Sequence, residues 1–219
     1  MTQKLTEIEA RVLGSLIEKQ LTTPEYYPLT MNALIAACNQ KSNRDPVVNY
    51  DETTVSAALE NLRDRNLVYV FYGSTSRVPK YKHMFPGVYE LEPSETAVLS
   101  VLMLRGAQTL GEIRGRSERL YDFRDLADAQ ETLDALIQRD EPLIAKLERQ
   151  PGQKDARYAH LLCGEEHLAV MAEAAARPAP GAHAGGGERI EKLEHEVERL
   201  SGELAEFKAA FDEFRKQFE

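Results

Sequence analysis

The chain has 219 residues; 42% are hydrophobic, 29% are charged, and the formal net charge at pH 7 is −9. This composition is typical of a soluble globular protein. No stretch approaches the roughly 18 apolar residues of a membrane span, and the amphipathic N-terminus lacks the apolar core of a signal peptide, so we expect a cytoplasmic protein. The acidic charge makes the whole chain a weak candidate for nucleic-acid binding, although residues 1–91 are neutral, residues 92–164 carry −3 and residues 165–219 carry −6.

The first predicted helix has a counterpart later in the chain. The segments EARVLGSL (residues 9–16) and ETAVLSVL (residues 95–102) share Val, Leu and Leu at the same spacing. A second pair of segments, VSAALENLRDR and AQETLDALIQR, aligns Leu59 with Leu133, Leu62 with Leu136 and Arg65 with Arg139. This self-similarity predicts two copies of one small fold, in domains at residues 1–91 and 92–175.

Each copy has the same order of predicted elements. Apolar residues at helical spacing predict a first helix, a second begins near Thr30 or Thr109, and a third begins near Asp51 or Asp125, which suit a helix N-terminus. Strand-like segments on either side of a polar turn then predict a hairpin. Three helices followed by a hairpin is the winged-helix arrangement. The predicted fold class is therefore α+β, mainly helical with small β-hairpins, in two tandem winged-helix domains plus a C-terminal coiled-coil helix.

The C-terminal part of the chain changes character twice. Residues 176–187 (ARPAPGAHAGGG) form a predicted flexible linker. In residues 188–219 the apolar positions alternate at spacings of three and four, which predicts a coiled-coil helix. The candidate dimerisation residues are Ile190, Leu193, Val197, Leu200, Leu204, Phe207, Phe211, Phe214 and Phe218. We expect a second copy of the chain to cover this stripe, with the chain's own domains or another protein as alternatives.

Several segments resemble the YceH-like family, bacterial proteins of tandem winged-helix form without an established function. The resemblance is carried by LIEKQLTTPEYYPLTMNALIAACNQKSNRDPV, VSAALENLRDRNLV, VPKYKHMF and LRGAQTLGEIRGRSERL, and it covers about residues 5–162. It implies the fold, and it implies no activity, cofactor or site residue.

The first copy carries the candidate DNA-binding residues. They come from the polar segment AACNQKSNRDP (residues 36–46), from the outward face of the third helix and from the hairpin, which are the parts that meet DNA in a winged helix. The candidates are Lys41, Arg44, Thr53, Ser56, Arg63, Arg77, Lys80 and Lys82. Residues 66–86 contain no acidic residue and interleave Tyr81 with lysines, whereas Glu60 and Asp64 share the outward face of the helix. The alternative is an ordinary solvated surface.

The second copy favours a protein contact or a spacer role. Its third helix carries an acidic stripe that would meet phosphates badly, formed by Asp125, Asp128, Glu131 and Asp134. Four arginines precede that stripe: Arg114, Arg116, Arg119 and Arg124. We expect them to pair with this acidic stripe or with Glu118 and Asp122, with contacts to a partner's carboxylates or to DNA phosphates as the alternatives.

No catalytic or metal-binding motif is evident. The two cysteines, Cys38 and Cys163, are expected to be buried reduced thiols. The segment HLLCGEEH groups Cys163 with His160 and His167, but no second Cys or His pair completes a four-ligand zinc set, so we predict no metal and no cofactor. The chain also lacks a phosphate-binding loop, a nucleophile elbow and a metal-ligand pair at helical spacing, so we expect no enzyme activity.

Two functions fit these patterns. The first is a homodimeric DNA-binding protein, a transcriptional regulator that uses its first winged helix while the coiled coil joins two protomers. The second is a protein–protein adaptor whose winged helices are docking platforms, as in chromosome-segregation accessory proteins. The charges of the polar segment and the hairpin favour DNA, whereas the net charge and the acidic stripe favour the adaptor.

Overall fold

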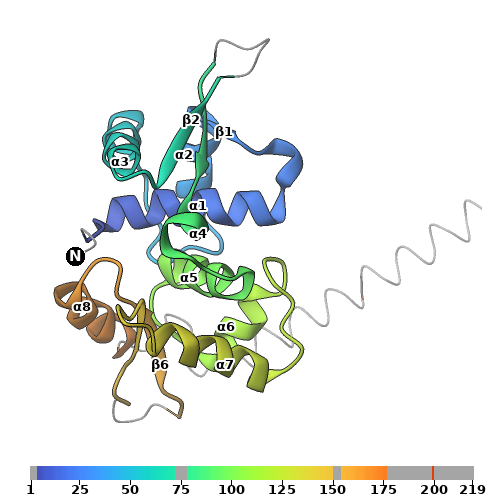
Figure 1. The fold of residues 1–219 in the computed structure, drawn as a ribbon, viewed down its shortest axis with the longest axis vertical. Helices are drawn as coiled ribbons and strands as arrows, with labels where there is room; N and C mark the ends of the chain where they lie inside the picture. Colours follow the sequence, from blue (N-terminus) through green and yellow to red (C-terminus); the bar gives the residue numbers. More distant parts are fainter. Residues whose placement is uncertain (1–3, 73–77, 150–153, 177–198, 200–219) are drawn as a thin grey trace, which may run out of the picture. The chain divides into compact units, whose positions relative to one another are not determined.

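Figure 1 shows the computed structural model of the chain, which describes residues 4–72, 78–149, 154–176 and 199. Residues 1–176 form one compact unit. Apart from Arg199, the predicted coiled coil lies outside the described residues, and so do all nine candidate dimerisation residues. None of the described helices is both long enough and apolar enough to cross a membrane.

The first repeat runs in the order helix, strand, helix, helix, strand, strand. Its elements are α1 (Glu7–Thr22), the short 3-10 helix η1 (Pro24–Tyr26), β1 (Leu29–Thr30), α2 (Met31–Cys38), α3 (Glu52–Asp64), β2 (Val68–Phe71) and β3 (Lys80–His83). The strands form an antiparallel sheet in the order β1-β3-β2. The two-residue strand β1 is an addition to the predicted elements.

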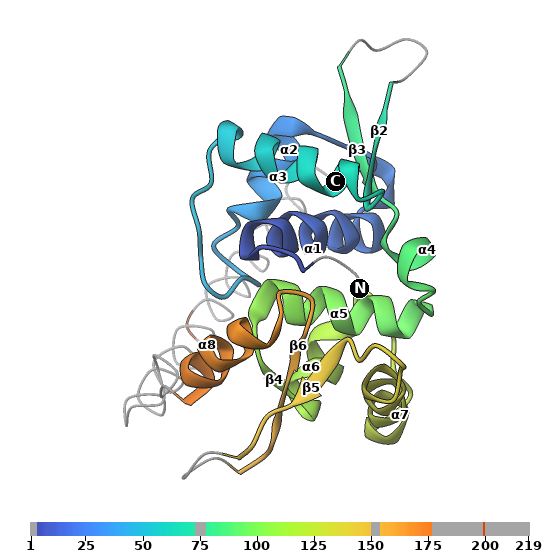
Figure 2. The same cartoon turned by 60° about the vertical axis from the view of Figure 1, so that its left-hand side comes forward.

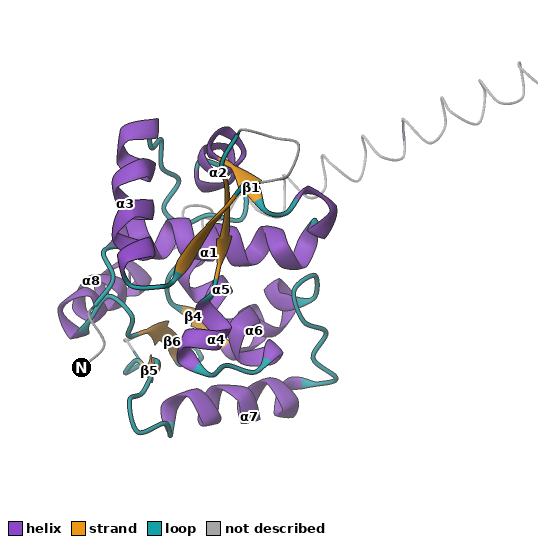
Figure 3. Cartoon of the chain, turned by 45° about the horizontal axis from the view of Figure 1, so that its top comes forward, coloured by secondary structure: helices purple, strands orange, loops and turns teal. Residues whose placement is uncertain are grey.

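The second repeat follows the same order after a short connecting helix. Its elements are α4 (Phe85–Tyr89), α5 (Pro93–Arg105), β4 (Gln108–Thr109), α6 (Leu110–Ser117), α7 (Leu126–Ile137), β5 (Ile144–Lys146), β6 (Arg157–His160) and α8 (Glu165–Ala176). Its antiparallel sheet has the order β4-β6-β5. Figure 3 shows helices surrounding one small sheet in each repeat. The structure therefore confirms a mixed α+β chain with small antiparallel sheets.

Equivalent residues cap equivalent helices in the two repeats. The Asp51 side chain accepts a hydrogen bond from a backbone N–H in the first turn of α3, and Asp125 does the same at α7, which confirms both predicted helix starts. Thr30 and Thr109 cap α2 and α6 in the same way. Because a cap satisfies a backbone donor that helix geometry leaves unpaired, these residues fix where the helices begin.

The two repeats share one hydrophobic core, with α1 and α5 side by side within it (Figures 1 and 2). Val12 and Leu16 of α1 and Leu99 and Leu102 of α5 are inaccessible to solvent. These are residues that the aligned segments place on the apolar faces of the two first helices. The repeats are therefore joined through the helices that begin them.

Gly14 lies where α1 and α5 approach closely. A Cβ atom added at Gly14 would lie 3.1 Å from both Leu104 Cγ and Met103 Cβ. The carbonyl oxygen of Gly14 accepts a hydrogen bond of 3.3 Å from Ser100 Oγ, which is buried in the same contact. A residue without a side chain is what allows the two helices to come this close.

An ion pair is repeated at the same place in both copies. Arg65 lies 3.3 Å from the carboxylate of Glu9, and Arg139 lies 3.7 Å from that of Glu95. Glu9 and Glu95 head the first pair of aligned segments, and the two arginines end the second pair. Both carboxylates are buried, so each pair offsets the cost of placing a charge inside the unit.

Candidate nucleic-acid interface

The hairpin of β2 and β3 carries a solvent-facing group of aromatic and basic side chains. Its register places Tyr69 opposite Lys82 and Phe71 opposite Lys80. Because successive residues of a strand alternate between the two sides of a sheet, these four side chains share one side, named here the hairpin face. Tyr69 is 56% exposed and Phe71 43%, and Lys82 Nζ lies 5.9 Å from the centre of the Tyr69 ring, within cation–π range.

The surroundings of the hairpin face are apolar or basic. Tyr72 and Val78, next to the hairpin tip, are also exposed. No acidic residue occurs between positions 66 and 86. Among the ion pairs of the described residues, none involves either lysine of the hairpin face. Arg77, the other predicted hairpin contact, lies outside the described residues.

The opposite side of the hairpin is anchored in the first repeat. Val68 and His83 are buried there, and the backbone N–H of His83 donates a hydrogen bond of 2.7 Å to the Tyr27 hydroxyl. Burial, helped by the charge of Lys82, lowers the pKa of His83 to about 4, so this ring is neutral near pH 7 and adds no charge to the hairpin. Tyr81 lies between Lys80 and Lys82 in the sequence, but its side chain lies on this inner side of the hairpin, away from the lysines.

The candidate DNA-binding residues on α3 lie close to carboxylate side chains. An open depression on this helix is lined by Glu52, Thr53, Ser56, Ala57 and Glu60. Thr53 and Arg63 are exposed and Ser56 is half-buried, so all three are accessible as the helical pattern predicts. The exposed side chains of Glu52 and Glu60 lie beside the two hydroxyls, however, and would repel a phosphate.

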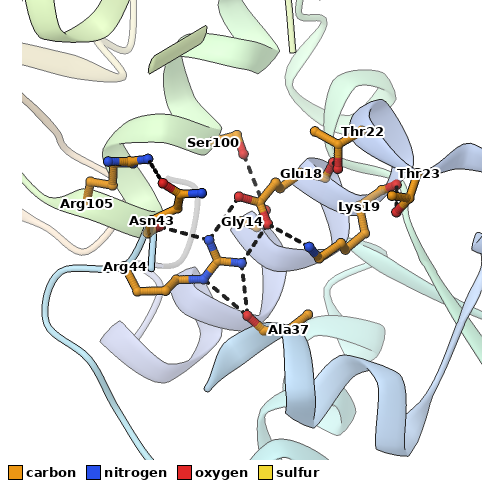
Figure 4. Close-up of polar contacts among 10 residues, drawn as sticks. All are labelled: Gly14, Glu18, Lys19, Thr22, Thr23, Ala37, Asn43, Arg44, Ser100 and Arg105. Atoms are coloured by element: carbon orange, nitrogen blue, oxygen red, sulfur yellow. Dashed lines mark hydrogen bonds and ion pairs between the residues drawn. The ribbon is translucent and has the colours of Figure 1, made fainter. Parts of the chain in front are cut away.

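Arg44 lies inside the protein, which corrects its predicted role as a phosphate contact. Its guanidinium is inaccessible to solvent and donates to the Glu18 carboxylate at 2.6 and 2.9 Å (Figure 4). It also donates to the carbonyl oxygen of Ala37 at 2.9 and 3.1 Å. Burial alone would raise the pKa of the Glu18 carboxyl, but the hydrogen bonds and charge of Arg44 outweigh it and lower that pKa.

The rest of the polar segment also serves the fold. Asn43 adopts a left-handed backbone conformation (φ 61°), which asparagine tolerates better than most residues. Its side-chain oxygen accepts a hydrogen bond from Arg105 at the end of α5 (Figure 4), and the Asp45 N–H donates to the Leu104 carbonyl at 2.9 Å. These bonds tie the first repeat to α5. Only Lys41, of the two cations predicted here, stays exposed to solvent.

In the second repeat, two of the basic side chains form ion pairs within the chain, and the aromatic ring of the hairpin is buried. Arg124 pairs with Asp128 of the acidic stripe at 3.0 Å, which confirms the expected pairing for this arginine. Arg116 pairs instead with Glu112 of its own helix, at 3.3 Å. The aromatic residue of the second hairpin, Tyr158, is only 3% exposed. The second hairpin therefore does not repeat the exposed aromatic surface of the first.

The turn after β6 brings together three side chains that sequence spacing alone does not join into a site. His160, Cys163 and His167 place one potential metal-ligand atom each within 4.8 Å of one another. Both cysteines are free thiols; Cys38 is buried elsewhere in the unit, and Cys163 is half-buried in this group.

A family model described as "Protein of unknown function, DUF480" matches residues 5–153. The chain belongs to this family. The chain is 49% identical over 222 residues to a UPF0502 protein of Pelobacter propionicus, with all of both chains covered. It is 53% identical over 177 residues to a UPF0502 protein of Opitutus terrae, covering 80% of this chain and 76% of the relative, and 43% identical over 217 residues to one of Citrobacter koseri, covering 97% and 96%. Membership of an uncharacterised bacterial family, the coarser part of the predicted resemblance, is thus confirmed.

Proposed function

We propose that this protein is a tandem winged-helix protein that binds double-stranded DNA through the hairpin of its first repeat. The observation that carries the proposal is the hairpin face, where two exposed aromatic rings adjoin two lysines that no described carboxylate neutralises. The order helix, strand, helix, helix, strand, strand supports a winged helix in each repeat, with β2 and β3 as the first wing. The YceH-like resemblance agrees with this arrangement.

In this proposal the wing makes the main contact and α3 stays at the edge of the duplex. Lysine side chains contact phosphates and account for most of the affinity, while the aromatic rings pack against sugars or bases. Glu52 and Glu60 keep the face of α3 away from the phosphates, so Thr53 and Ser56 are poorly placed to read bases. We therefore expect binding that depends strongly on salt and weakly on sequence.

Replacing both hairpin lysines, Lys80→Ala/Lys82→Ala, should weaken binding to random-sequence duplexes by the same factor for every sequence. It should also reduce the slope of log affinity against log salt by about 2, since each lost phosphate contact removes about one unit. Fluorescence anisotropy of a labelled duplex between 50 and 200 mM salt measures both quantities. Lys146→Ala, which changes an exposed lysine of the hairpin in the second repeat, is the matched control and should bind as the wild type does.

The aromatic half of the hairpin face gives a second arm to that experiment. Tyr69→Ala/Phe71→Ala should lower the affinity without changing the salt slope, because these rings carry no charge. Wild-type protein that does not bind any duplex at 50 mM salt, or lysine variants that bind as tightly as wild type, would reject a DNA-binding hairpin.

The proposal also includes a dimer, as in a two-fold-symmetric transcriptional regulator, joined by the heptad stripe of residues 188–219. A chain that ends at Arg177 keeps the whole compact unit, since α8 ends at Ala176. Sedimentation velocity should show a dimer for the full chain and a monomer for the shortened chain, because only the stripe is lost. The shortened chain should also bind DNA more weakly, because one hairpin rather than two engages each duplex. A shortened chain that still forms dimers would place the protomer contact within residues 1–176.

One observation favours the adaptor as the second candidate. Asp125, which caps α7, and Glu131 and Asp134 within α7 are exposed and give the second repeat an acidic surface. That surface suits a basic protein partner and repels DNA. The absence of duplex binding at 50 mM salt would favour this candidate.

A further inference from the structure

The junction of β6 and α8 gathers three side chains with the chemistry of transition-metal ligands. His160 ends β6, Cys163 lies in the turn, and His167 lies in the first turn of α8. Their potential ligand atoms all lie within 4.8 Å of one another. In a tetrahedral zinc site such nitrogen and sulfur atoms are about 3.3–3.6 Å apart, so small side-chain rotations suffice to close this group on one ion.

His160 is a buried ligand without another use among the described residues. It is 3% exposed, and its Nδ1 atom is buried without a hydrogen-bond partner. Buried polar atoms nearly always have partners, so the unpaired Nδ1 atom of His160 leaves this ring free to accept a ligand.

Glu7 orients His167. The Glu7 Oε1 atom lies 3.1 Å from His167 Nδ1. With the proton on Nδ1 donated to this carboxylate, the lone pair of His167 is left on Nε2. A carboxylate that holds the outer nitrogen of a histidine in this way is the usual support of a metal-bound imidazole, because it fixes both the ring and its tautomer.

The turn that holds the group is fixed against the first repeat. The Leu5 N–H donates to the Leu162 carbonyl at 2.8 Å. Gly164 has φ +89°, a backbone conformation that favours glycine. The three ligand positions are therefore held in place by the start of α1.

We propose that His160, Cys163 and His167 bind one Zn²⁺ ion through two imidazole nitrogens and a thiolate, with Glu7 as the residue that positions His167. Binding replaces the thiol proton of Cys163, which passes to solvent, so affinity rises with pH. A thiolate with two imidazoles selects Zn²⁺ over Mg²⁺ and Ca²⁺, which prefer oxygen. Three protein ligands leave a fourth position for water or an exchangeable ligand, as in zinc sites that do more than hold a fold together.

The test uses the full chain, reduced and freed of metal with a chelator, and Co²⁺ as the spectroscopic probe. We expect one equivalent of Co²⁺ to give the visible bands of a tetrahedral ion and a near-ultraviolet thiolate charge-transfer band, both removed by Zn²⁺. Cys163→Ala should lose the charge-transfer band, and His167→Gln should lose stoichiometric binding. Cys38→Ala, which removes the other cysteine, is the matched control and should keep the wild-type spectrum. Circular dichroism of each variant checks that the chain still folds.

Competition with a chromophoric chelator then gives the Zn²⁺ affinity. Glu7→Gln should keep the wild-type spectrum and bind Zn²⁺ about 10- to 100-fold more weakly, as expected for the loss of a supporting carboxylate. A wild-type chain without a thiolate band, or Cys163→Ala binding as tightly as wild type, would overturn the site. Complete loss of binding in Glu7→Gln would make Glu7 a ligand and overturn its positioning role.

Discussion

Arg44→Met should lower the free energy of unfolding by about 3 kcal/mol, because the largely buried Glu18 carboxylate loses its two hydrogen bonds to the Arg44 guanidinium and keeps only the longer ion pair with Lys19, at 3.4 Å. The change also removes the hydrogen bonds to the Ala37 carbonyl. Urea denaturation followed by circular dichroism at pH 7 measures the effect. Lys41→Met, in the same polar segment but exposed, is the control and should change stability by less than about 0.5 kcal/mol.

The stability difference between wild type and Arg44→Met should depend on pH and should shrink at low pH. The folded-state pKa of Glu18 lies below its ordinary value of 4.5. Its pairing therefore contributes stability above the unfolded pKa, and this contribution is lost as the pH falls through the folded pKa. The stability gap between wild type and Arg44→Met should accordingly narrow below about pH 4.5. A gap that stays constant down to pH 3, or one below 1 kcal/mol at pH 7, would show that Arg44 acts by filling space.

Gly14→Leu should lower the free energy of unfolding by about 3 kcal/mol, because the new side chain would enter the contact between α1 and α5, where even a Cβ atom meets Leu104 and Met103 at 3.1 Å. The measurement is again urea denaturation. Gly115→Leu on α6 is the matched control: no atom lies within 4 Å of a Cβ there, and a better helix former should stabilise the protein by up to about 1 kcal/mol. Wild-type stability in Gly14→Leu would mean that the two helices can move apart at little cost.

Local patterns were enough to predict the order of the main helices and of the hairpin strands in each repeat. The period of the apolar residues marks the helices, and Asp51 and Asp125 mark where two of them begin, because capping depends on neighbouring residues in the chain. The strands β1 and β4 have two residues each and are too short to show an alternating pattern. Alignment of the repeats shows that α1 and α5 are equivalent, but equivalence does not predict that they pack against each other.

The candidate site depended on partners that are distant in sequence, and this limited its prediction. Lys41 and Arg44 are two cations of one polar segment, and only the position of Glu18 on α1 decides that Arg44 is the buried one. Tyr69 and Phe71 join the lysines because of the strand register, which is set across a hairpin turn and is not visible in either strand alone. The sequence around Cys163 shows no second Cys or His pair. Glu7, which contacts His167, lies about 160 residues earlier in the chain, so sequence spacing does not connect it with this group.

The hydrogen bond between Gly14 and Ser100 also bears on how such a chain arises. These two residues occupy the same position of the two aligned segments. When two equivalent repeats are related by a two-fold axis, equivalent residues contact each other only close to that axis. The contact of α1 with α5 thus has the form of a self-complementary dimer interface enclosed in one polypeptide. We expect an ancestral chain with one repeat to have paired with its copy through this helix. After such a duplication each half could diverge: the strand β2 of the first repeat exposes Tyr69 and Phe71, whereas the corresponding strand β5 of the second repeat carries no aromatic residue.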